Sequence, residues 1–172
     1  MASTSATVNG WRARASKTWY PTDGSWKSDG SSTGINVSIS DPTGNNKYGV
    51  IIKVTTPNDA KIGSISELSV TFEAYSRGTT TGALYGSLRT TYTDSGSGDT
   101  ASTFRTNAIG NEASKTGIST NSLSPTTVTM SFSGTFSKNT SYYLFLYTKS
   151  TGHIFGMNND WNGSATITYT TK

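Results

Sequence analysis

Short runs of alternating apolar and polar residues most strongly limit how this chain can fold. In residues 128–136, Val, Met and Phe alternate with Thr and Ser, and residues 165–169 repeat the pattern with Ala, Ile and Tyr. A period of two is typical of a strand with one buried face and one hydrated face. Helical spacing is absent, and the 58 Ser and Thr residues with 18 Gly disfavour long helices. Short turns at 64–67 and 111–114 are the most helix that we expect.

The alternating runs are separated by turn residues at regular intervals, which is typical of a sandwich or barrel. The expected strands cover residues 6–14, 35–39, 48–56, 67–76, 84–93, 126–136, 141–148 and 164–171. We therefore predict one all-β domain over residues 1–172, an antiparallel two-sheet jelly-roll β-sandwich of eight to nine strands. Residues 15–34 and 94–125 are expected to form long loops, the second with room for one short strand.

Composition indicates a folded protein and excludes several kinds of partner. Only 14% of residues are charged, but 19 aromatic residues in patterned strands argue against disorder. The net charge of +4 comes from scattered basic residues, so we expect no nucleic-acid binding. No apolar stretch approaches the roughly 20 residues that span a bilayer, so we expect no membrane insertion. Without Cys there is no disulfide and no thiolate metal site.

The first residues, MASTSATV, lack the basic and apolar regions of a signal peptide. From this we expect either a protein released from a cytoplasm by lysis or assembly, or one that has lost its export signal.

The outward strand faces differ in chemistry. In the last strands they are mainly Thr and Ser, a solvated surface. Three other strands turn aromatic and charged residues outward, and their candidate glycan-binding residues are Glu73, Tyr75, Tyr85, Arg89, Tyr143 and Tyr147. If these strands share a sheet, the rings can stack on pyranoses while the charged groups bind hydroxyls. In the alternative, loops cover this face and the tyrosines pack beneath them as a second small core.

Tryptophans in predicted loops are further candidates. Trp19 and Trp26 lie among turn residues, and Trp161 follows Asp160 in an Asn-rich segment. An exposed Trp of this kind can stack on a sugar or anchor a contact with another protein. In the alternative, each Trp packs into one end of the sandwich and closes it.

Catalytic and metal-binding signals are weak. The single His153 cannot build a His-based metal site, and Ser is too abundant in this chain for a Ser-His-Asp triad to be a specific signal. Glu67 and Glu73 lie roughly 20 Å apart along one strand, too far for a glycosidase pair, which leaves Glu73 with Glu112 or Asp160 as the catalytic alternative. Residues 94–99 and 158–160 are ordinary turn sequences, so a calcium site is unsupported. We predict no enzyme activity and no cofactor.

Residues 84–92, followed by 126–148, resemble jelly-roll modules of phage structural proteins and bacterial surface proteins, and less specifically carbohydrate-binding modules. The resemblance covers about the last half of the chain and transfers no binding residue. It implies a β-sandwich displayed on a virion or cell surface, often as an oligomer, with glycan contact as a common role.

The first functional hypothesis is a non-enzymatic virion structural protein, a phage decoration or tail or fibre appendage that attaches to host glycans. Its expected partners are other virion proteins, further copies of itself and a cell-surface glycan. The alternative is a carbohydrate-binding module of a secreted or cell-surface protein, with an extracellular or cell-surface location. A small glycoside hydrolase is the third hypothesis.

Overall fold

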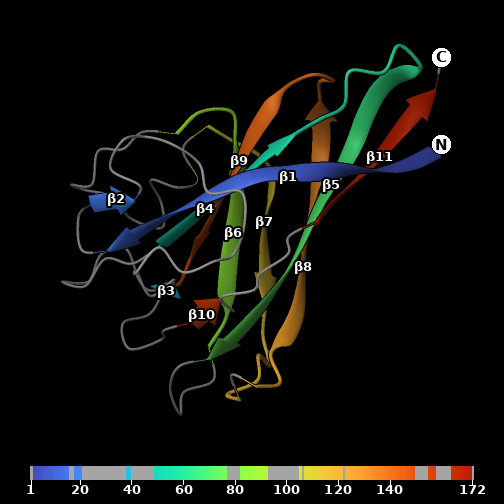
Figure 1. The fold of residues 1–172 in the computed structure, drawn as a ribbon. Helices are drawn as coiled ribbons and strands as arrows, with labels where there is room; N and C mark the ends of the chain where they lie inside the picture. The colour runs from blue at the N-terminus through green and yellow to red at the C-terminus, as the bar shows by residue number, and fades with distance from the viewer. Residues whose placement is uncertain are drawn as a thin grey trace.

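The computed structural model describes residues 2–15, 18–20, 38–39, 49–76, 82–92, 105, 107–121, 123–149, 155–157 and 164–171. Every element bounded within these ranges is a strand, which confirms the all-β prediction (Figure 1). The strands are β1 (Ala2–Ala15), β2 (Thr18–Tyr20), β3 (Ser38–Ile39), β4 (Gly49–Thr55), β5 (Ile62–Ser76), β6 (Leu84–Arg89), β7 (Ala108–Lys115), β8 (Thr126–Phe136), β9 (Ser141–Tyr147), β10 (Phe155–Met157) and β11 (Ser164–Thr171). The short turns allowed at 64–67 or 111–114 are not formed, since these residues belong to β5 and β7.

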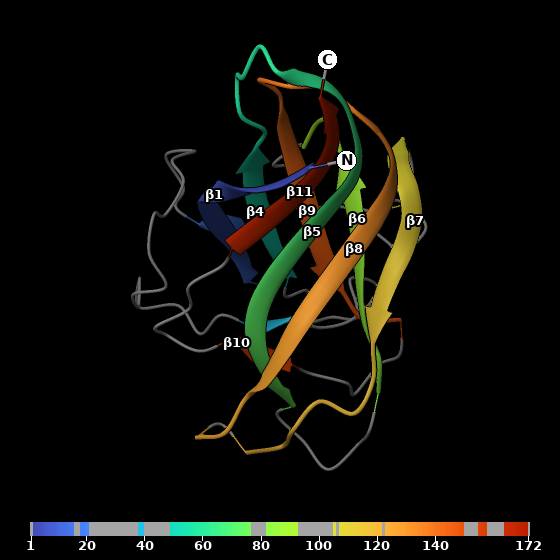
Figure 2. The same cartoon turned by 90° about the vertical axis from the view of Figure 1, so that its right-hand side faces the viewer.

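The eight longer strands form two antiparallel sheets. Sheet A has the order β1-β11-β5-β8, and sheet B has the order β4-β9-β6-β7. Ranked along the chain, these strands run 1-8-3-6 in one sheet and 2-7-4-5 in the other, which is the jelly-roll order. Figure 2 shows β5, β8 and β11 of sheet A in front of β4 and β9 of sheet B. The predicted jelly roll is therefore confirmed, with β2, β3 and β10 as short additions of two or three residues.

Strand β1 belongs to both sheets. Its first part pairs with β11 from Ala2 to Thr7, and its second part pairs with β4 from Val8 to Arg14. The register shifts between Val8 and Gly10, where the strand passes from one sheet to the other. An irregularity of this kind bends a strand and increases its twist. The shift thus lets a single 14-residue strand link both sheets.

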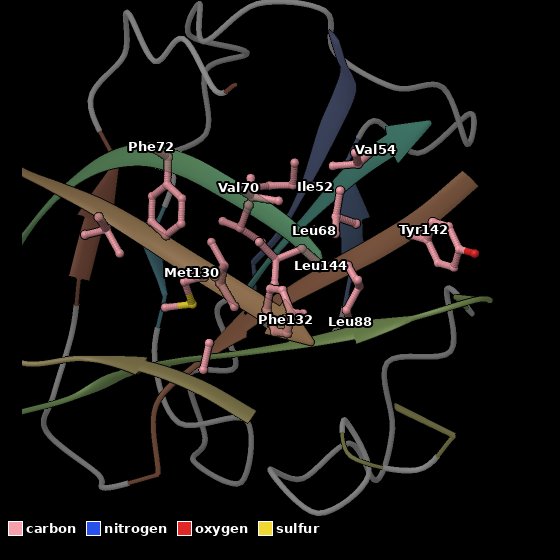
Figure 3. Close-up of a cluster of buried hydrophobic side chains, with 14 of the residues drawn as sticks. Ile52, Val54, Leu68, Val70, Phe72, Leu88, Met130, Phe132, Tyr142 and Leu144 are labelled. Carbon is pink, nitrogen blue, oxygen red and sulfur yellow. The ribbon is translucent and has the colours of Figure 1, made fainter. Parts of the chain in front are cut away.

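The main core lies between the sheets and comes from inward residues of the alternating runs whose side chains are described (Figure 3). Phe72 of β5 and Met130 and Phe132 of β8 face Leu88 of β6 and Leu144 of β9, and all five are fully buried. Alternation along residues 68–74, 84–92, 128–136 and 144–146 predicts a set of inward residues, and all of them except Tyr92 are buried in this core. Tyr92 packs outside the core, because β6 ends at Arg89 and the alternation does not continue beyond it.

The two segments predicted as long loops contain short strands. Residues 94–125 include the eight-residue β7, and residues 15–34 include β2. Residues 21–34 and 94–104 lie outside the described residues.

Strand β7 carries a bulge opposite Ser87 of β6. Gly86 pairs with Ala113 and Leu88 with Ile109, so three residues of β7 oppose the single Ser87. Gly110, the first of the three, has a φ of 72°, a left-handed conformation that suits glycine. The bulge sends the next two side chains, Asn111 and Glu112, to different neighbours: Asn111 reaches the backbone of β8, and Glu112 reaches Tyr147 of β9.

Candidate functional site

The six strand residues predicted to share a binding face are divided between the two sheets. Tyr85 and Arg89 of β6 lie beside Tyr143 and Tyr147 of β9, on the outer face of sheet B. Glu73 and Tyr75 belong to β5 in sheet A, which pairs with β8, β10 and β11. The condition for one shared face, that these strands lie in the same sheet, is therefore not met for Glu73 and Tyr75. Alternation along a strand gives the direction of a side chain but not the sheet that the strand joins.

Cross-strand register arranges the outer face of sheet B in three rows. Arg89, Tyr143 and Lys53 form the first row, and Ser87, Phe145 and Ile51 form the second. Tyr85 and Tyr147 form the third. We call these eight residues the sheet B face, and the first row with the adjacent Tyr92 its Tyr143 end.

The centre of the sheet B face is a second small core. Ile51, Phe145 and Tyr147 are buried together, and Tyr85, Tyr92 and Tyr143 pack partly buried against them. The alternative that tyrosines pack as a second core is thus correct for Tyr147, which is fully buried. The half-buried Tyr85 and Tyr143 remain candidates for ligand contact, and the structure adds Tyr92, which the sequence did not indicate.

The hydroxyl of Tyr147 is held in a polar network. It donates a hydrogen bond to Glu112 Oε2, and so it accepts from the Ser87 hydroxyl, 2.6 Å away. Lys149 Nζ donates to the other oxygen of Glu112 at 2.5 Å. Arg105 donates to Ser87 Oγ at 3.3 Å and to the Gly110 carbonyl at 2.9 Å. Fully paired polar groups of this kind fix the positions of the side chains that they join.

The network shifts the acidities of its two central groups. Burial raises the pKa of Tyr147 far above its ordinary value, and the hydrogen bond to Glu112 raises it further. Burial also acts to raise the pKa of Glu112, but the hydrogen bonds from Lys149 and Tyr147 and the charges of Lys149 and Arg105 outweigh it, so the net pKa is lowered. Tyr147 is therefore a neutral donor and Glu112 a charged acceptor near neutral pH.

Sequence reasoning missed most of this network. Ser87, Arg105 and Lys149 were not candidates, and Glu112 was considered only as a catalytic partner of Glu73. Contacts that join residues 35 and 60 positions apart leave no local pattern. The only local sign is Gly110, since a glycine within a strand often marks a bulge.

The rings at the two ends of the sheet B face have different neighbours. Lys149 Nζ lies 4.3 Å from the ring centroid of Tyr85, which also stacks on Tyr147 at 6.1 Å. At the Tyr143 end, Tyr92 and Tyr143 have centroids 4.9 Å apart and ring planes tilted by 51°. Burial, and then the neighbouring Tyr92, raises the pKa of Tyr143. Tyr92 and Tyr143 are both half-buried, so part of each residue stays exposed, and an exposed aromatic ring can stack on a flat apolar surface.

Arg89 lies beside this pair of rings. Its Cζ atom is 5.1 Å from the ring centroid of Phe145, a cation–π contact. Its Nε atom is buried without a hydrogen-bond partner among the described residues. Among the described residues, the Phe145 ring is the contact that positions the guanidinium.

The carboxylates proposed as a catalytic alternative lie far apart in the fold. Glu73 points outward from sheet A, whereas Glu112 belongs to the network on the outer side of sheet B. Asp160, the other partner considered, lies outside the described residues. Within the described ranges, no group of three or more His, Cys, Asp or Glu side chains is placed to hold a metal ion. The expectations of no catalysis and no cofactor stay predictions.

No described helix has the length and apolar character needed to cross a membrane.

The tryptophan candidates are not tested by the structure. The backbone of Trp19 lies in β2 and pairs with Arg14 of β1. Trp26, Asp160 and Trp161 lie outside the described residues.

No protein-family model and no curated protein sequence matches this chain, but solved structures do. One comprises the CBM22-1 and GH10 modules of an endo-1,4-beta-D-xylanase from Clostridium thermocellum with xylohexaose, at 11% identity and a TM-score of 0.38 over 94% of this chain and 26% of that chain. Another is the carbohydrate-binding module CBM36 with calcium and xylotriose, at 10% identity and a TM-score of 0.36 over 98% and 100% of the two chains.

A third is the enzymatically active domain of the bacteriophage CBA120 tailspike protein 4, at 10% identity and a TM-score of 0.29 over 99% of this chain and 19% of that chain. This chain thus spans about a quarter of the xylanase chain and a fifth of the tailspike chain. Carbohydrate-binding modules and a phage tailspike are both among the structural neighbours. At these TM-scores the likenesses carry no functional argument.

Proposed function

We propose that this chain is a non-catalytic carbohydrate-binding β-sandwich of a secreted or cell-surface protein, and that it contacts its glycan at the Tyr143 end of the sheet B face. The observation that carries the proposal is the tilted pair of half-buried rings, Tyr92 and Tyr143, beside the charged Arg89. Aromatic rings bind the apolar faces of pyranoses, and nearby polar groups orient the hydroxyls.

The second core supports this role by fixing the binding surface. Ile51, Phe145 and Tyr147 fill the space beneath the half-buried tyrosines, and sheet hydrogen bonds hold β4, β6 and β9 in register. A ring that is packed on one side loses little further freedom when a ligand covers the other. Tyr147 itself belongs to the scaffold, because it is fully buried.

A glycan array with the intact chain, followed by titration of the best ligand, tests the proposal. Tyr143→Ala removes the stacking ring and is expected to weaken binding by about 10-fold or more, whereas Tyr143→Phe keeps the ring and most of the affinity. Tyr75→Ala is the matched control, since Tyr75 is also a half-buried strand tyrosine but belongs to sheet A.

Thermal melting of each variant separates loss of binding from loss of folding. A folded wild type that binds no glycan would contradict the proposal. An equal loss of affinity in Tyr75→Ala and Tyr143→Ala would also contradict it.

The place of display is a separate question. A virion location and association with virion proteins or further copies of the chain were the first hypothesis from the sequence, and they stay predictions. Glycan binding does not depend on them, because the Tyr143 end is formed within one chain.

A further inference from the structure

We infer that the Tyr143 end selects a glycan with an anionic substituent, a carboxylate or a sulfate ester on a pyranose ring. The inference rests on the proposed function and adds the class of ligand. Its first support is register: Tyr143 of β9 lies directly between Lys53 of β4 and Arg89 of β6. Cross-strand neighbours have Cβ atoms about 5 Å apart, so a sugar stacked on Tyr143 is within reach of both cations.

The charge of Arg89 is not neutralised by the described side chains. Its guanidinium packs on Phe145, its Nε atom has no described hydrogen-bond partner, and the described ion pair on this side of the sandwich joins Lys149 to Glu112. A half-buried guanidinium is weakly hydrated and presents a planar fork of donors that matches a carboxylate or sulfate. An anionic group bound there therefore gains charge-assisted hydrogen bonds that a neutral sugar cannot supply.

The distribution of charge between the two faces favours the same ligand. Among the described side chains, the outer face of sheet A carries the carboxylates Glu67 and Glu73. The described charged side chains on the outer side of sheet B are the cations Lys53, Arg89, Arg105 and Lys149 and one carboxylate, Glu112. A cationic face opposite an acidic one attracts anions and orients their approach. The cations are interleaved with tyrosines, which suits a charged sugar.

Calorimetric titration of the whole chain with three hexasaccharides tests the inference. The probes are a galacturonic acid oligomer, a sulfated heparin fragment and neutral cellohexaose. We expect at least one acidic probe to bind about 10-fold or more tightly than cellohexaose at low salt, and the preference to shrink at high salt through screening. The two acidic probes distinguish a carboxylate from a sulfate as the recognised group.

Arg89→Met keeps an apolar side chain against Phe145 but removes the charge. It is expected to weaken acidic-probe binding by about 10-fold or more and to change cellohexaose binding little. Arg89→Lys keeps the charge without the planar fork and should lie between the wild type and Arg89→Met. Lys61→Met is the charge-matched control, because Lys61 is exposed in the turn before β5 and should leave acidic binding unchanged.

Each failure has a distinct meaning. In one outcome, cellohexaose binds as tightly as the acidic probes or more tightly, and Tyr143→Ala abolishes this binding. That result would overturn the anionic preference but leave the proposed function standing. If Lys61→Met and Arg89→Met lose the same affinity for the acidic probes, the effect comes from the net charge of the protein and not from Arg89. That result would also overturn the inference. A folded wild type that binds none of the probes, nor any glycan on the array, would overturn both.

Discussion

Gly110 of β7 lies against the backbone of β8. Its φ is 72°, and a Cβ atom at this position would lie 2.2 Å from the carbonyl oxygen of Ser133. Gly117 has nearly the same φ, 70°, with nothing within 4 Å of its would-be Cβ. The two glycines thus separate the cost of a left-handed conformation from the cost of a backbone clash.

Gly117→Ala is expected to lower the free energy of unfolding by about 1–2 kcal/mol, the cost of a left-handed residue with a Cβ. Gly110→Ala adds the clash with Ser133 and should cost about 3 kcal/mol or more. Urea unfolding curves with equal slopes measure the difference. Equal losses in the two variants would show that β7 moves away from β8 at little cost.

Glu112 couples the stability of the fold to acid. Because its pKa is lowered below 4.5 in the folded protein, the charged carboxylate contributes stability that is fully present above this value. The contribution is lost as the pH falls through the folded-state pKa. Glu112→Gln should therefore be less stable than the wild type at neutral pH, and the difference should shrink below about pH 4.

Unfolding midpoints measured from pH 7 to pH 3 check this prediction. Glu73→Gln is the control, since Glu73 is an exposed carboxylate on the other sheet, and its profile should follow the wild type. A Glu112→Gln profile that runs parallel to the wild type throughout would contradict the assigned role.

Strand β7 is joined to β8 by a side chain instead of a backbone ladder. Asn111 Nδ2 donates to the Ser131 carbonyl at 3.0 Å, and the Ser133 N–H donates to Asn111 Oδ1 at 3.0 Å. One amide group thus supplies the donor and acceptor that a paired strand residue would offer. In the described part of the chain, each of the two strands pairs with a single neighbour, β7 with β6 and β8 with β5. The contact therefore joins one edge of sheet A to one edge of sheet B.

Asn111→Ala should lower the free energy of unfolding by about 1–2 kcal/mol, because both hydrogen bonds are lost at a partly hydrated site. Hydrogen exchange should also become faster at the Ser133 amide. Ser114→Ala, an exposed position on the same strand, is expected to change neither quantity. Unchanged protection of the Ser133 amide in Asn111→Ala would contradict the bridging role.

At the scale of elements, the sequence predicts strands better than it predicts their neighbours. The runs 126–136 and 141–148 correspond closely to β8 and β9 because each has a clean period of two. β7 is poorly patterned, since its bulge interrupts the alternation and Asn111 and Glu112 serve other strands. The placement of Glu73 and Tyr75 with the other candidates failed for a related reason: strand pairing is set by long-range contacts.

At the scale of the whole molecule, the jelly-roll prediction succeeded because several alternating runs separated by turn residues have few ways to bury their apolar faces. The location of the candidate site was predicted only in part. Tyr85, Arg89 and Tyr143 do share a face. Tyr147 supports that face from below, because it is buried together with Ile51 and Phe145. Whether a ring is buried depends on residues from several strands, which no single run reveals.

Alternation alone was enough to specify an all-β chain, most of the inward residues and the direction of the strand candidates whose side chains are described. Those properties are local, because successive side chains in a strand point to opposite faces. The tertiary structure decided which strands share a sheet, that Tyr147 is tied to Glu112, and that Arg89 and Lys53 flank Tyr143. These properties depend on contacts between residues far apart in the chain. The partners in such contacts are selected by the pairing of strands within each sheet and by the packing of the two sheets.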